Sequence, residues 1–136
     1  MHPKVFHSLI DQPRLIAAIA AAERRTSGKI YVYVSHRAID DALAQAQKRF
    51  AKLGFNRLHE YRPAALVYIA PRTHKFAIVG NSLIHERCGE PFWTKLAENL
   101  SADLKTGDIS AGLLNTVASL DAALTEHFPA ATHGAA

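Results

Sequence analysis

Several residue types that can move protons or bind ions follow the β-rich runs of this chain. His36, Asp40 and Asp41 come after one such run, and Arg72 and His74 follow another. An imidazole beside a carboxylate can act as a general base with its orienting partner, or as part of a metal site. The same pattern is typical of a helix start, where aspartates cap the first turn and interact with its dipole.

A second group combines cations with carboxylates and an amide, and consists of Lys29, Arg62, Asn81, His85, Glu86 and Glu90. Lysine and arginine bind anions, and the arginine fork matches a phosphate group. A nearby glutamate can donate or accept a proton. Such a group can hold an anion or a partner, or Lys29 and Arg62 can simply pair with Glu86 or Glu90.

Cys88 is the only cysteine of the chain. It is a candidate nucleophile if a neighbour such as His85 lowers the pKa of the thiol, because the thiolate is the reactive form. A lone cysteine is also commonly a small buried hydrophobe. A single cysteine cannot form an internal disulfide, which fits a reducing compartment.

Composition indicates one globular domain, because the 136 residues are 49% hydrophobic and 21% charged. The net charge of +4 favours anionic partners without any dense basic run. The first residues lack the apolar core of a signal peptide, and no apolar run approaches the roughly 20 residues that span a bilayer. We therefore expect a cytoplasmic protein with no membrane span.

The basic helix faces offer little for nucleic acid. Their cations are Arg24, Arg25, Lys48, Arg49 and Lys52. No aromatic residues are interleaved with them in the sequence, whereas proteins that bind single strands combine cations with aromatic platforms. Nucleic-acid binding is therefore disfavoured.

Helices and strands alternate in the order α-β-α-β-β-α-α. Helical spacing predicts helices over about 13–25, 39–53, 91–105 and 110–127, with strands over 29–34, 64–70 and 75–79. The apolar positions Ile39, Leu43, Ala46 and Phe50 indicate the buried face of the second helix. Strand 29–34 is β-branched or aromatic almost throughout, which suggests burial on both faces.

This order predicts an α/β fold with a mixed sheet. The first two strands are expected to be parallel through a right-handed crossover, and residues 71–74 turn the chain into an antiparallel hairpin. One border of the sheet, the first edge, then collects Lys29, Arg62 and Asn81. The other border, the second edge, collects His36, Arg37, Asp40, Asp41, Arg72 and His74 at the carboxyl ends of the parallel strands, where such sheets usually bind ligands.

Several longer motifs accumulate into a family pattern. They are AIAAAERRTSGKIYVYV, AQKRFAKLG, LVYIAPRTHKFAIVGN, IHERCGEPFW and the final HFP. Together they resemble the TPM domain, or TPM phosphatase family, over nearly the whole chain. The resemblance implies a three-layer α/β/α sandwich with a small mixed sheet. It also implies phosphatase activity, binding of calcium or another divalent cation, and assembly or maintenance of membrane complexes. The domain is expected over 13–128, between an N-terminal extension, 1–12, and a flexible tail, 129–136.

The chain departs from the family pattern at the first edge. The family typically has Ser-Gly-Glu where this chain has Lys29 as the third residue, and Gly-Asp where it has Asn81. These changes remove acids and add a cation, which disfavours a hard metal ion that needs oxygen ligands. We therefore expect no cofactor, and binding of calcium or another divalent cation is disfavoured. No residue is assigned a catalytic role.

Two functions follow from this comparison. The first is a binding or accessory module with a degenerate cation site, acting on a protein partner near the cytoplasmic face of the membrane. The alternative is a low-activity phosphatase in which Lys29 and Arg62 hold phosphate while Glu86 or Glu90 transfers a proton.

Overall fold

A computed structural model describes residues 12–35, 37–53 and 63–130 of the chain. Its elements are α2 (Gln12–Arg25), β1 (Lys29–Val34), α3 (Ala42–Lys52), β2 (Ala64–Ala70), the short 3-10 helix η1 (Pro71–Thr73), β3 (Lys75–Gly80), α4 (Ser82–Cys88), α5 (Glu90–Thr106) and α6 (Ile109–His127). The predicted order of helices and strands is confirmed, and α4 and η1 are added to it.

The sheet has the strand order β1-β2-β3, with β1 parallel and β3 antiparallel to the central strand. Strand β2 is buried along its whole length, whereas β1 is buried only at Ile30 and half-buried elsewhere. The prediction that β1 is buried on both faces was therefore wrong. β-branched and aromatic residues are also common in a half-buried outermost strand, which β1 is in this sheet. Composition alone therefore did not distinguish a fully buried strand from a half-buried one.

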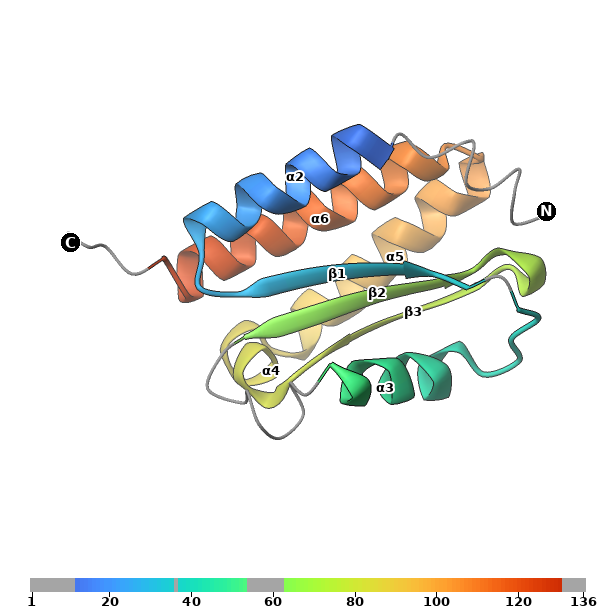
Figure 1. The fold of residues 1–136 in the computed structure, drawn as a ribbon, viewed down its shortest axis with the longest axis horizontal. Coiled ribbons are helices and arrows are strands. Elements are labelled where there is room, and N and C mark those ends of the chain that lie inside the picture. The colour runs from blue at the N-terminus through green and yellow to red at the C-terminus, as the bar shows by residue number, and fades with distance from the viewer. Residues whose placement is uncertain (1–11, 36, 54–62, 131–136) are drawn as a thin grey trace.

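The sheet is the middle of three layers, as the family resemblance implied. Helices α2, α5 and α6 lie on one side of it, and α3 lies on the other (Figure 1). One core cluster joins the first group of helices to the sheet and includes Leu100, Leu120 and Leu124. A second cluster lies under α3, around Phe50 and Leu66.

Helix α3 is shorter and turned differently from the prediction. It begins at Ala42 because the Asp41 carboxylate caps it, accepting a hydrogen bond from the Ala44 N–H at 3.0 Å. Ala46 and Phe50 are buried as predicted, but Leu43 is 51% exposed. Since Ala42 takes the inward position, the expected burial of Leu43 was wrong.

Helices α5 and α6 agree closely with the predicted spacing. Their buried residues include the predicted Trp93, Leu96, Leu100, Leu113, Val117, Leu120 and Leu124. Gly107 separates the two helices with a φ of 88°, a conformation that favours glycine. Helix α4 was not predicted, because its seven residues are too few for a clear period.

The end of α6 is attached to the turn between α2 and β1. Thr26 forms an isolated bridge with Pro129, and the Ala130 N–H donates to the Arg25 carbonyl at 2.9 Å. The tail predicted from residue 129 stays a prediction beyond this point, because residues 131–136 lie outside the described part, as do residues 1–11. Among the described helices, none is long and apolar enough to cross a bilayer.

Candidate functional site

The first edge forms where the topology predicted it. The Lys29 N–H donates to the Pro63 carbonyl at 2.9 Å, and the Asn81 N–H donates to the Ala64 carbonyl at 3.2 Å. The starts of β1 and β2 and the end of β3 therefore meet at one border of the sheet. Arg62, the other cation expected here, lies outside the described residues.

The Lys29 side chain has a partner that sequence patterns did not suggest. Its Nζ lies 3.6 Å from Oε1 of Glu23, whose other oxygen accepts a hydrogen bond from the Ile30 N–H at 3.1 Å. Glu23, on α2, thus takes the place proposed for Glu86 or Glu90. The carboxylate connects the helix to the first residues of β1.

Close packing surrounds the end of β3. A Cβ atom added at Gly80 would lie 2.6 Å from Cγ2 of Ile84 and 2.8 Å from a ring carbon of Trp93, so only glycine fits without a shift. Asn81 follows as a buried residue at the start of α4, and its carbonyl accepts a hydrogen bond from the His85 N–H at 3.2 Å. This part of the first edge is a packed junction between strand and helix.

The remaining candidates of the first edge lie on α4 and α5. The His85 ring is exposed and lies 4.6 Å from the Trp93 ring, between centroids. Glu86 and Glu90 are both exposed, the former on α4 and the latter at the start of α5. These side chains face solvent and can exchange protons with it.

Cys88 is a weak nucleophile in this setting. Burial raises the pKa of its thiol, and the negative charge of Glu126 raises that pKa further. The thiolate fraction at neutral pH is therefore below that of an ordinary cysteine. The partly buried side chain packs against the core on the α6 side of the sheet, as a small hydrophobe does.

At the second edge, both aspartates take part in hydrogen bonds that stabilise the local structure. The Asp41 carboxylate caps α3, and the Asp40 carbonyl accepts a hydrogen bond from Lys75 Nζ at 2.6 Å. Arg72 and His74 are exposed in the turn between β2 and β3, where His74 has a φ of 56°.

His36 is outside the described residues, so its pairing with either aspartate stays a prediction. Within the described ranges, no group of three or more His, Cys, Asp or Glu residues could hold a metal ion.

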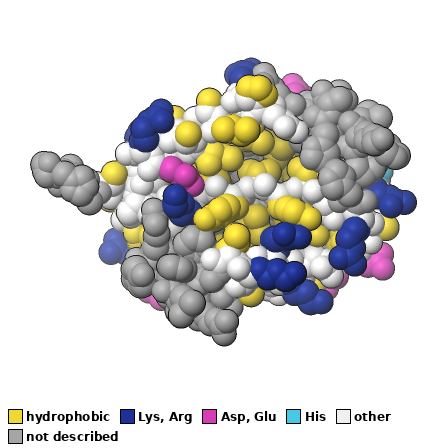
Figure 2. All heavy atoms as spheres, in the orientation of Figure 1, with side chains coloured by type: hydrophobic (Ala, Val, Ile, Leu, Met, Phe, Trp, Pro, Cys, Tyr) yellow, Lys and Arg dark blue, Asp and Glu magenta, His cyan; other side chains and the backbone are white. Residues whose placement is uncertain are grey.

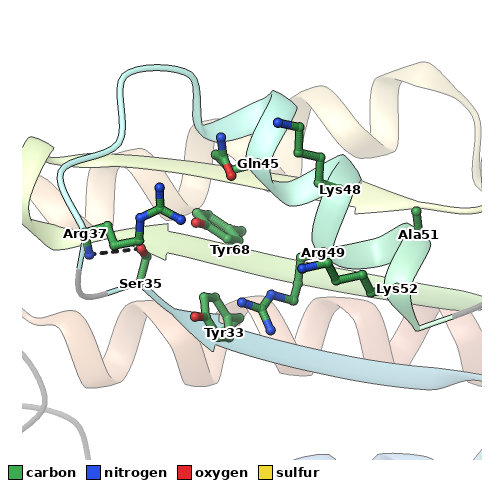
Figure 3. A pocket seen from close by; sticks show the side chains of 9 residues that line it. All are labelled: Tyr33, Ser35, Arg37, Gln45, Lys48, Arg49, Ala51, Lys52 and Tyr68. Atoms are coloured by element: carbon green, nitrogen blue, oxygen red, sulfur yellow. Dashed lines mark hydrogen bonds between the residues drawn. The ribbon is translucent and has the colours of Figure 1, made fainter.

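A groove of about 480 Å³, which was not predicted, lies between α3 and the sheet. We call it the cationic groove. Figure 3 shows its lining: Tyr33, Ser35, Arg37, Gln45, Lys48, Arg49, Ala51, Lys52 and Tyr68. Tyr33 comes from β1 and Tyr68 from β2, two residues come from the loop after β1, and the other five come from α3.

Two tyrosines form the floor of the cationic groove. Tyr33 and Tyr68 are direct partners in the parallel register, and their ring centroids lie 5.4 Å apart. The Arg49 guanidinium carbon lies 3.9 Å from the centre of the Tyr33 ring, a cation–π contact that holds the arginine against the floor. Only 4% of Tyr68 is exposed, so this ring belongs to the core cluster under α3, and Tyr33 packs against that cluster.

The charge of the cationic groove is of one sign. Four of its nine lining residues are Lys or Arg, and none is Asp or Glu. Among the described residues, none of these four cations forms an ion pair. Figure 2 shows Lys and Arg side chains gathered over α3, and Figure 3 places Arg37 at one end of the groove and Lys52 at the other.

A partial signal for this groove was present in the sequence. Tyr33 and Tyr68 lie near the carboxyl ends of the two parallel strands, where ligands usually bind. Side chains alternate between faces along a strand, and both tyrosines point to the α3 side. Arg37 was the one groove residue that the expected second edge included.

The fold and the positions of the longer motifs agree with the TPM domain. A family model of the TPM domain matches residues 8–123. The chain belongs to the TPM-domain family. The match confirms the resemblance and covers both edges and the cationic groove of this TPM domain.

Among solved structures, one example is similar over most of the chain. It is the NMR structure of the BA42 protein from the psychrophilic bacterium Bizionia argentinensis, with a TM-score of 0.76 and 26% sequence identity. The similarity covers 86% of this chain and 80% of that chain. Comparison with curated proteins finds no match.

Proposed function

We propose that this TPM domain is a binding or accessory module whose cation site at the first edge is degenerate. The observation that carries the proposal is the ion pair between Lys29 and Glu23, whose charged atoms lie 3.6 Å apart. A cation now occupies the position where the family resemblance implies an acid. The neighbouring carboxylate is engaged by that cation and by the Ile30 N–H, which leaves it poorly placed to bind a hard metal ion.

Two further observations support a binding function over catalysis. Asn81 replaces the second expected acid and is buried in the junction between β3 and α4. The raised pKa of Cys88 also lowers the fraction of reactive thiolate. The proposal includes a protein partner near the cytoplasmic face of the membrane.

Calorimetric titration of the purified protein with calcium tests the degenerate cation site. We expect no saturable binding at micromolar calcium, because the expected oxygen ligands are replaced or engaged. Asn81→Ala and Glu86→Gln are the matched variants. Micromolar binding by the unaltered protein that either variant abolishes would contradict the proposal.

Phosphate-ester hydrolysis at the same edge is the competing function. It is favoured by the exposure of Glu86 and Glu90, which lets either carboxylate reach a substrate and exchange protons with water. Turnover of a phosphomonoester is the assay, with Lys29→Ala and Arg62→Ala as variants. If the purified protein turns over the ester and both variants lose the activity, hydrolysis replaces the binding function.

A further inference from the structure

The cationic groove places like charges together, and none of the described residues forms an ion pair with them. Lys48 and Lys52 are four residues apart on α3, a spacing at which like charges repel each other. Arg37 and Arg49 add two more positive charges to the same lining. A cluster of this kind destabilises the folded chain by self-repulsion unless an anion neutralises it.

The donors of the groove suit phosphate oxygens. The Arg49 guanidinium lies over the Tyr33 ring, and this contact positions it before any ligand arrives. A fixed guanidinium can give two parallel hydrogen bonds to a phosphate group, and the lysines add point charges. Tyr33 is only partly buried, and its hydroxyl is a further potential donor for the same ligand.

The arrangement of the cations favours an anion with two linked charged groups. Arg37 lies at one end of the groove and Lys52 at the other, with the tyrosine floor between them (Figure 3). Two linked phosphates carry more negative charge and more acceptor oxygens than a single phosphate, so they can pair with more of the four cations that line the groove. The volume of about 480 Å³ lies within the range of small-molecule sites.

The aromatic rings are poorly placed to stack on a nucleobase. Arg49 covers one face of Tyr33, and Tyr68 is only 4% exposed. Single-stranded nucleic acids bind mainly through bases stacked on open aromatic faces. The groove therefore favours the phosphate part of a ligand over its base.

We propose that the cationic groove binds the pyrophosphate group, either free or as part of a larger small molecule. The proposal goes beyond the proposed function, which concerns the first edge and a protein partner. The groove lies on the α3 side of the sheet, apart from the first edge on which that function was argued. The two sites can therefore be tested separately.

Calorimetric titration at low salt with sodium pyrophosphate tests the proposal. The double variant R37Q/K52Q removes one cation from each end of the groove. The control R24Q/K95Q removes an exposed Arg and an exposed Lys from α2 and α5, so the net charge changes equally. We expect R37Q/K52Q to weaken binding by about tenfold or more, which corresponds to about 1.4 kcal/mol, and the control to change it by less than about twofold.

Three further probes decide the ligand class. Orthophosphate is expected to bind at least about tenfold more weakly than pyrophosphate, since it offers one charged group to the cations instead of two. A nucleoside diphosphate is expected to bind within about threefold of pyrophosphate, because the base gains little stacking. A single-stranded oligonucleotide that binds while pyrophosphate does not would overturn the proposal in favour of nucleic acid.

Other results would also overturn it. These are no heat of binding at millimolar pyrophosphate, equal loss in both double variants, and equal affinity for orthophosphate. Thermal unfolding of each variant confirms that it folds. If R37Q/K52Q does not fold, the single variant Lys48→Gln is titrated with pyrophosphate in its place. Phosphomonoester turnover is measured in parallel. Turnover would contradict the proposed binding function at the first edge, whereas failure of pyrophosphate binding contradicts only this inference.

Discussion

Lys29 at the first edge and Lys48 in the cationic groove are cations of the same kind in opposite surroundings. Nζ of Lys29 lies 3.6 Å from a carboxylate oxygen of Glu23. Lys48 borders a groove whose described lining contains three other cations and no acid. The first lysine is part of the framework of the sheet, and the second has no acidic partner among the described residues.

This difference shows why a count of charges does not locate a binding site. The family departures at Lys29 and Asn81 drew attention to the first edge, yet both residues are engaged in local structure there. The cations of α3 looked like an ordinary solvated helix face. Their meaning depends on Tyr33 and Tyr68, which the parallel register brings beneath them.

The largest effect is expected from a change in the packing of the first edge. Gly80→Ala places a methyl group against Ile84 and Trp93, so we expect a loss of about 1–3 kcal/mol in the free energy of unfolding. Chemical denaturation measures it. Ser82→Ala, at an exposed position two residues away, should change the value by less than about 0.5 kcal/mol. Equal stability of Gly80→Ala and the unaltered protein would indicate an open, adaptable edge.

A smaller effect is expected from the ion pair of the first edge. Lys29→Gln removes the charge that faces Glu23, and we expect a loss of about 0.2–1 kcal/mol in the free energy of unfolding. The loss should shrink as salt is added, because the pair is partly exposed to solvent. Unfolding at two salt concentrations measures both effects. An increase in stability would show that Lys29 is repelled by its surroundings instead of paired.

The smallest effect should have the opposite sign. Lys48→Gln relieves the repulsion with Lys52 one turn away, so we expect a gain of about 0.2–0.5 kcal/mol at low salt. Thermal unfolding of this variant beside Lys95→Gln, which changes an exposed lysine of α5, measures the gain against a matched control. A loss of stability in Lys48→Gln would mean that the groove cations already have a stabilising partner, and the contrast with Lys29 would no longer hold.

Much of the fold was predictable because long periodic segments carry their own signal. The inward residues of α5 and α6 repeat at helical spacing, and the family motifs are concentrated in the strands and the hairpin. The errors fell where a short pattern permits two solutions. Ala42 and Leu43 can both begin the inward face of α3, and the position of the Asp41 cap selects Ala42.

The candidate site was less predictable, because it depends on side-chain contacts between different elements. Glu23 and Lys29 lie on either side of the short turn between α2 and β1, and their spacing does not show that the two side chains point toward each other. Tyr33 and Tyr68 are separated in the sequence by the crossover that contains α3. Only the register between β1 and β2 makes them neighbours. Topology correctly predicted which strand ends meet, but could not predict which charges would find partners.

The position of Trp93 gives the protein an optical reporter for one of these two regions. It is the only tryptophan of the chain, it packs against the end of β3, and its ring lies beside His85. The aromatic residues of the cationic groove are both tyrosines. Fluorescence excited at a wavelength that tryptophan absorbs and tyrosine does not therefore reports on the surroundings of Trp93 at the first edge. We expect a ligand that binds at the first edge to change this emission. A ligand that binds in the cationic groove, on the α3 side, should leave it unchanged.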